Sequence, residues 1–216
     1  SALARSAASA GAATMASRIL GLIRDQVLAY YFGAGAAMEA YRPAFKIPNL
    51  LRDLFAEGAM SAAFVPTFTR HVADSGKESG WRLANNVTNA LLVVTGGLVI
   101  LGIVFATPLV SALAGGYAGE TLQDGTGKLA LTIYLARIML PMLTLVAVAA
   151  AVMGMLNSLR HFFIPALSPA MFNVVTVVMA VALVPLAPAL GITQPIVIIA
   201  VASVLGGVAH LALPWP

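Results

Sequence analysis

The sequence has no cysteine and few charged or aromatic residues. Only 9% of its 216 residues are charged and 7% are aromatic, whereas 60% are hydrophobic. The lack of cysteine excludes disulfide bonds, thiolate catalysis and cysteine-ligated metal. A soluble domain has about 25% charged residues. The composition and a mean hydropathy of +0.94 therefore indicate a membrane protein.

The common enzyme and metal motifs are also missing. No GxSxG, phosphate-binding loop or dinucleotide fingerprint occurs. His71, His161 and His210 are isolated from one another and from paired carboxylates, which argues against a metal site. The net charge of +4 is no sign of nucleic-acid binding, because basic residues in membrane proteins gather at cytoplasmic ends or in functional cavities. We predict no catalytic residue, metal, cofactor or nucleic-acid partner.

Long unbroken apolar runs predict an all-α integral membrane protein. A β-barrel would show alternating segments of about ten residues instead. About 20 apolar residues are needed for each crossing. By this measure there are six expected spans, at residues 5–32, 38–69, 83–114, 129–157, 162–184 and 196–213. The segments between them, including the polar stretch 70–82, are expected to be loops.

Basic residues are distributed unequally between the two sides that these spans define. One side carries Arg5, Arg70, Lys77, Arg82 and Arg160, whereas the other carries only Lys128. Because short cytoplasmic loops are enriched in Lys and Arg, we expect the N-terminus to be cytoplasmic.

Charge is concentrated in the first two spans. Nine of the 20 charged residues, counted as 12 basic plus 8 acidic, lie between positions 18 and 57. They are Arg18, Arg24, Asp25, Glu39, Arg42, Lys46, Arg52, Asp53 and Glu57. Each charge at the bilayer centre costs about 2.5–3.5 kcal/mol on insertion scales. Such a density predicts a wet interior face rather than a lipid-exposed one.

Helical spacing groups these charges. Arg18 and Asp25 share one face of the first span, and Arg24 is turned about 100° from Asp25. The second span carries a group of charges within an arc of about 60° on a straight helix, with Asn49 beside them: Glu39, Arg42, Lys46, Asp53 and Glu57. Arg52 is turned about 100° from Asp53. We expect Pro43 and Pro48 to kink or break that helix.

The charges are five cations and four anions, so one positive charge is left after pairing. Guanidinium groups match phosphate oxygens in a bidentate way, and this predicts a cavity for phosphate or diphosphate. The alternative is a set of structural ion pairs that fix two helices. Arg42 and Lys46 could instead extend to an interface.

Three further polar residues lie in apolar segments, and each could have a functional or a structural role. Arg137, one turn before Pro141, is a second cavity cation or a structural partner. Asn157 and Asn173 are expected to make hydrogen bonds between helices rather than to contact ligand.

Three stretches resemble the MurJ/MviN family of lipid II flippases. They are "SRILGLIRDQVLAYYFGAG", "AFKIPNLLRDLFAEGAMSAAFVP" and "GMLNSLRHFFIPALSPAMFN", which occur in the family's order. The resemblance covers essentially the whole chain. It implies a place in the multidrug/oligosaccharidyl-lipid/polysaccharide exporter superfamily, whose members have two lobes around a central cavity. The six spans would form the N-terminal lobe, and the second lobe would be absent from these 216 residues.

The resemblance also implies an activity. Such proteins move lipid II, the undecaprenyl-diphosphate-linked peptidoglycan precursor, to the outer leaflet of the bacterial cytoplasmic membrane. The family's essential arginines fall on Arg18, Arg24 and Arg52, and its acidic positions on Asp25, Glu39 and Glu57. The chain departs from the family at Arg42 and Asp53. The expected partners are lipid II, membrane lipid and the second lobe, and the residues identify no coupling ion.

Three other functions remain open from the residues. A related exporter would carry drugs or other polyprenyl-linked glycans, although a drug exporter has less need of three arginines. An intramembrane enzyme acting on polyprenyl diphosphate would need a metal cluster or a nucleophile, and the arginines near Asp53 and Glu57 disfavour Mg²⁺ there. A scaffold for cell-wall enzymes would not depend on Arg52.

Overall fold

A computed structural model describes residues 2–52, 65–159 and 161–215, with side-chain positions for residues 11–50, 65–76, 78–159 and 161–215. Within these ranges the chain is helical, with no strand and one isolated bridge between Thr121 and Gly127. The α-helices are α1 (Ala2–Phe32), α2 (Ala36–Arg52), α3 (Val65–Val104), α4 (Ala106–Ala114), α5 (Lys128–Met139), α6 (Met142–Ser158), α7 (Phe163–Leu183) and α8 (Ile196–Ala212), and a short 3₁₀ helix, η2 (Gly115–Tyr117), follows α4.

Several helices are suited to a bilayer. Three helical segments of the described chain are long and apolar enough to cross a membrane, namely Glu78–Val104, Lys128–Ser158 and Phe163–Leu183. Helix α8 is a shorter apolar helix of 17 residues. Helix α1 has 31 residues, or about 46 Å at 1.5 Å per residue, but its apolar sequence is interrupted by charge. The predicted all-α membrane fold is confirmed.

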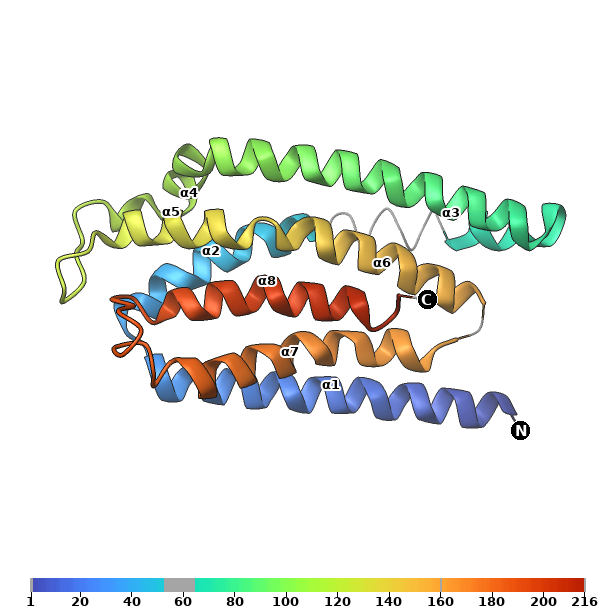
Figure 1. Ribbon diagram of the computed structural model, residues 1–216, viewed down its shortest axis with the longest axis horizontal. Coiled ribbons are helices and arrows are strands. Elements are labelled where there is room, and N and C mark those ends of the chain that lie inside the picture. Colours follow the sequence, from blue (N-terminus) through green and yellow to red (C-terminus); the bar gives the residue numbers. More distant parts are fainter. Residues whose placement is uncertain (1, 53–64, 160, 216) are drawn as a thin grey trace.

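The long helices lie side by side and alternate in direction (Figure 1). The chain termini and the turn between α6 and α7 lie at one end of the bundle, which we call the terminal end. The turn after α1, the loop between η2 and α5 and the turn between α7 and α8 lie at the other, which we call the loop end (Figure 1). The polar residues 70–82 lie at the terminal end, on the same side as the turn after α6.

Residues 70–82 form helix rather than the expected loop. Helix α3 changes direction at Gly76, the residue in this helix with non-helical dihedral angles (φ 80°, ψ 171°). The two arms fold back on each other and approach closely. A Cβ added to Gly80 would lie only 2.4 Å from Val72 Cγ2, so glycine leaves the space that this approach needs. His71 Nε2 lies 2.8 Å from Ser79 Oγ across the turn. A single glycine therefore supplies the reversal, and Phe68 and Ala84 of the two arms are buried together with Ala151 of α6.

Helix α2 continues through both of its prolines, so the expected break is not seen within Ala36–Arg52. Pro43 has no N–H to donate to the carbonyl of Glu39 four residues earlier. The Tyr117 hydroxyl donates to that carbonyl instead, at 3.4 Å. A side chain from another element thus satisfies the group that proline leaves free, as is usual for prolines in membrane helices.

Two of the expected spans are each divided into two helices. The span at 83–114 corresponds to the second arm of α3 and to α4, which are separated at Phe105. The span at 129–157 corresponds to α5 and α6, which are separated at Leu140 and Pro141. Within the described ranges, the positions of six predicted spans therefore hold eight α-helices, of which α3 also extends through residues 70–82.

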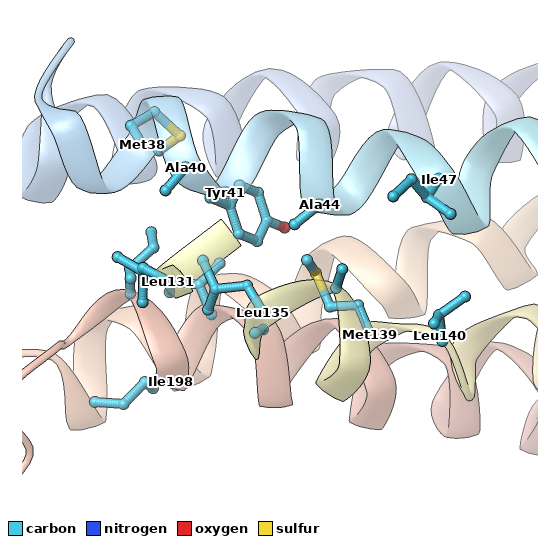
Figure 2. Packing of buried hydrophobic residues seen from close by; sticks show 14 of the residues in the cluster. Met38, Ala40, Tyr41, Ala44, Ile47, Leu131, Leu135, Met139, Leu140 and Ile198 are labelled. Atoms are coloured by element: carbon cyan, nitrogen blue, oxygen red, sulfur yellow. The ribbon is translucent and has the colours of Figure 1, made fainter. Parts of the chain in front are cut away.

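The main apolar core lies between α2, α5 and α8 (Figure 2). Ala40, Ala44, Leu135 and Met139 are fully buried there. Figure 2 shows the α2 side chains facing Leu135 and Met139 of α5. Alanines let the helices approach closely, which matters in lipid because close packing rather than a hydrophobic force holds helices together.

A polar contact crosses this core. The hydroxyl of Tyr41 on α2 lies 3.0 Å from Ser203 Oγ on α8. Ser203 already donates to the carbonyl of Ile199 at 2.8 Å, so Tyr41 is the donor between the two side chains. The core therefore fixes α2, which carries much of the charge, against α8.

Candidate functional site

Arg24 is the best anchored of the cations in the charged segment whose side chains are described. Its Nε and Nη2 donate to Asp25 Oδ1 at 3.1 and 2.8 Å, and its Nη1 donates to Asn173 Oδ1 of α7 at 3.0 Å. The Arg24 side chain is 24% exposed, whereas that of Asp25 is 61% exposed. The long arginine side chain reaches its neighbour although the two Cβ atoms point about 100° apart. The guanidinium is held on two sides and still has N–H groups to offer.

Asn173 joins α1 and α7 by two bonds. It accepts from Arg24, and its Nδ2 donates to the carbonyl of Ser17 at 3.2 Å. A Cβ on Gly21 would lie 3.6 Å from this Nδ2, an ordinary van der Waals distance, so Gly21 borders the amide. The expectation that Asn173 makes hydrogen bonds between helices is confirmed.

Two cavities adjoin at Arg24, which lines both of them together with Phe45. The first, which we call the charged cavity, has a volume of about 380 Å³ and lies between α1 and α2. Its polar lining is Arg24, Asp25, Tyr41 and Arg42. Two guanidinium groups and one carboxylate leave a positive balance in this cavity.

The second, which we call the amide cavity, has a volume of about 360 Å³. Its walls come from five helices, α1, α2, α6, α7 and α8. It is lined by Arg24, Phe45, Asn49, Met142, Val146, Pro169, Phe172, Asn173 and His210. No carboxylate is among these lining residues, so the polar groups beside Arg24 are neutral amides and an imidazole.

Asn49 and His210 differ in how they are held. Asn49 Nδ2 donates to the carbonyl of Phe45 at 3.0 Å, whereas its Oδ1 is buried without a hydrogen-bond partner in the described part of the chain. His210 is 6% exposed. Ser168 Oγ lies 3.1 Å from His210 Nδ1 and donates to the His210 carbonyl at 2.5 Å. The serine thus orients the histidine at the wall of the cavity.

Three further predicted site residues of the first two helices are exposed. Arg18, Arg42 and Lys46 are exposed, and of these only Arg42 lines one of the two described cavities. Among the described residues, Arg18 and Lys46 have no hydrogen bond or ion pair. The backbone of Arg52 ends α2, whereas Asp53 and Glu57 lie outside the described residues.

Glu39 lies apart from the arginines, at the loop end. Its carboxylate pairs with Lys128 Nζ, which also binds Glu120 at 2.7 Å. Lys128 Nζ lies 4.0 Å from the centre of the Tyr117 ring, and its side chain is 6% exposed. This cluster of Glu39, Tyr117, Glu120 and Lys128, which we call the loop-end cluster, ties α2 to the loop before α5.

Sequence reasoning did not select several of these residues as site residues. Asn173, Ser168 and His210 come from α7 and α8, and each looks like an isolated polar residue in an apolar helix. Lys128 stood out only as the single basic residue of its side. Arg137 is on the exposed face of α5 and lines neither described cavity. Among the described residues, no group of three His, Asp or Glu side chains could hold a metal ion.

Comparison with known proteins gives consistent matches. Residues 28–216 match the family model described as lipid II flippase MurJ. The chain is 39% identical over 171 residues to a probable lipid II flippase MurJ of Rhizobium tropici, covering 77% of this chain and 31% of that protein. It is 32% identical over 203 residues to the lipid II flippase MurJ of Burkholderia cenocepacia, covering 94% and 37%.

A solved structure has the same fold. The chain is similar to a lipid II flippase MurJ in an inward closed conformation, with a TM-score of 0.69 and 28% identity, over 94% of this chain and 41% of that one. The chain therefore spans about a third of the length of the relatives it matches. At this identity the likeness extends to sequence as well as fold.

Proposed function

Because this chain belongs to the MurJ family of lipid II flippases, we propose that it forms the N-terminal lobe of a transporter that moves lipid II across the bacterial cytoplasmic membrane. The relatives are named as flippases, which are transporters rather than enzymes. A second lobe would come from sequence that those relatives have outside the matched region. The substrate-bearing cavity would lie between the two lobes.

The observation that carries this proposal is the fixed guanidinium of Arg24 at the junction of two cavities. Asp25 and Asn173 hold Arg24 in one orientation, so little conformational entropy is lost when it binds an anion. Arg42 adds a second positive charge to the charged cavity. Guanidinium groups bind phosphate oxygens with paired hydrogen bonds. Arg18 and Arg52 would join Arg24 around the diphosphate.

Transport would proceed by alternating access. With the lobes open to the cytoplasm, the arginines bind the diphosphate while the lipid tail stays in the bilayer. Rocking of the lobes then exposes the headgroup to the other side. An inside-negative potential favours outward movement of an anion by about 2.3 kcal/mol per charge per 100 mV. Asp25, which binds Arg24 on its exposed side, would limit how tightly the substrate is held.

The proposed orientation has the terminal end of the bundle in the cytoplasm. Arg70 and Arg82 lie in the hairpin at this end and are exposed. At the loop end, Lys128 is buried between two carboxylates. Cytoplasmic loops are enriched in Lys and Arg. The exposed arginines therefore favour the terminal end as the cytoplasmic one.

Complementation tests the proposal. The protein, expressed from its complete gene, should support growth of cells depleted of their own lipid II flippase. Arg24→Ala should abolish this growth, and Arg24→Lys should impair it, because an ammonium cannot form the paired bonds. Arg137→Ala is the matched control, since Arg137 is exposed and lines neither described cavity. Full growth with Arg18→Ala, Arg24→Ala and Arg52→Ala at normal protein levels would overturn the diphosphate site.

A further inference from the structure

We propose that the amide cavity binds the sugar that is attached to the diphosphate, so that this lobe recognises the headgroup as well as its charge. The inference rests on the proposed function and deepens it, because it assigns a ligand to a space behind the arginines. The cavity volume of about 360 Å³ is within the range of about 300–1,000 Å³ that small-ligand sites occupy.

The chemistry of the lining fits a neutral, hydroxyl-rich group. The side-chain amides of Asn49 and Asn173 can both donate and accept hydrogen bonds, as sugar hydroxyls do, and the ring of His210 adds a further polar group to the lining. The rings of Phe45 and Phe172, whose centroids are 6.1 Å apart, supply apolar wall on which the C–H face of a sugar can lie. A few polar groups within an apolar wall are typical of a specific ligand site.

The side-chain oxygen of Asn49 is an acceptor in this cavity that lacks a hydrogen-bond donor. It is buried and has no donor among the described residues, although the amide nitrogen is bound to Phe45. An unpaired buried acceptor is costly, and native proteins contain few of them. A hydroxyl or amide N–H of a bound sugar, reached by a small turn of the amide, would supply the missing donor.

Other occupants fit this space less well. A free anion would meet a single guanidinium, that of Arg24, because no other Arg or Lys is among the lining residues. A metal cation would meet no carboxylate in the lining. A lipid tail has no donor to offer, so it would leave the buried side-chain oxygen of Asn49 unpaired, which is unfavourable in an apolar setting.

The position of the cavity links it to the diphosphate. Arg24 and Phe45 line both cavities, so one guanidinium borders the positively charged space and the neutral one. The first sugar of the headgroup is bonded directly to the diphosphate. A diphosphate on Arg24 therefore brings that sugar to the mouth of the amide cavity without any further movement of the protein.

A comparison of two lipids tests the inference. Affinities of the full-length protein in nanodiscs would be measured for undecaprenyl diphosphate and for undecaprenyl-diphospho-N-acetylglucosamine. We expect the unmodified protein to bind the sugar-bearing lipid about tenfold more tightly, an effect of roughly one or two well-made hydrogen bonds. Asn49→Leu should reduce this preference to less than about twofold, and Asn157→Leu, the same change at an exposed position on α6, should leave it intact.

A second variant guards against a folding defect in the first. Val146→Phe fills the amide cavity from α6 without touching its polar groups, and it should remove the same preference. Equal binding of the two lipids by the unmodified protein would overturn the sugar site and leave the diphosphate proposal standing. A preference that survives both variants in folded protein would also overturn it. If neither lipid binds, both proposals are overturned together.

Discussion

Asn173 of α7 accepts a hydrogen bond from Arg24 of α1 at 3.0 Å, across 149 positions of sequence. The same amide donates to the Ser17 carbonyl, so one side chain both joins two helices and orients the cation of the site. Arg24 therefore depends for its position on a residue that carries no charge.

The first prediction is that Asn173→Leu weakens binding of undecaprenyl diphosphate several-fold, because Arg24 loses one of its two anchors. The free energy of unfolding should fall by about 1–3 kcal/mol, because Asn173 makes two hydrogen bonds and each is usually worth about 0.5–1.5 kcal/mol. Asn173→Asp should weaken diphosphate binding, because a carboxylate neutralises the guanidinium. It should also lower stability, because a carboxylate cannot donate to the Ser17 carbonyl. Lipid titration and thermal unfolding measure the two effects. An Asn173→Asp protein that binds as tightly as the original would show that Arg24 does not hold the anion.

The second prediction concerns the loop-end cluster. Lys128→Met leaves the carboxylates of Glu39 and Glu120 close together without a cation. Because both carboxylates are about half exposed, at 48% and 53%, we expect a modest loss of about 1–2 kcal/mol in the free energy of unfolding. Glu120→Gln should cost less, since Lys128 keeps Glu39. Adding Glu39→Gln to Lys128→Met should restore part of the loss, and an absence of such recovery would mean that carboxylate repulsion is not its cause.

The third prediction tests the hairpin at residues 65–82. A methyl group on Gly80 would lie 2.4 Å from Val72 Cγ2, so Gly80→Ala should destabilise the protein by about 1–3 kcal/mol through overpacking. Val72→Ala in the same protein should relieve most of that cost. Thermal unfolding of the two single variants and the double variant measures the coupling. If the stability losses of the two single variants simply add in the double variant, Gly80 and Val72 are not in contact and the hairpin packing is wrong.

The fourth prediction is a pH dependence at the loop end. Hydrogen bonds from the Thr126 backbone and hydroxyl, and then from Gln194, lower the pKa of Asp124 below its ordinary value of 3.8. A lowered pKa means that the folded state favours the carboxylate. Its contribution to stability is therefore full above pH 3.8 and is lost as the pH falls through the folded-state value. Hydrogen exchange of residues 118–127 should increase over that interval, and Asp124→Asn should remove the pH dependence.

The sequence predicts the membrane class and the helical architecture because apolar composition and run length depend on the chain alone. It fails at residues 70–82, where polar composition suggested a loop. That segment buries only one side of each arm, with Phe68 and Val72 facing Gly80 and Ala84, so its exposed sides are polar although it is helical. The sequence also could not predict that α2 continues without a break. The hydroxyl that satisfies the Glu39 carbonyl comes from Tyr117, which is distant in the sequence.

The candidate site shows the same division. Arg24 and Asp25 are adjacent and could be selected by their charge in an apolar segment. Their partner Asn173 could not be chosen in the same way, because only the packing of α1 against α7 brings it near. Glu39 was grouped with the arginines by helical spacing. Its partner is instead Lys128, the first residue of α5. The spacing of residues along one helix predicts which side chains share a face. It does not predict their partners, because these come from whichever helix or loop packs against that face.

The division of the longest apolar segment at Leu140 and Pro141 has a mechanical meaning. Both residues keep right-handed helical dihedral angles, so α5 and α6 continue one another without a loop. Pro141 has no N–H for the carbonyl of Arg137, and the ladder is therefore one bond short at this level. Bending there gives up one backbone hydrogen bond fewer than bending within α5 or α6. We therefore expect any tilt of α5 relative to α6 to be concentrated at Leu140 and Pro141, where proline most often kinks a helix.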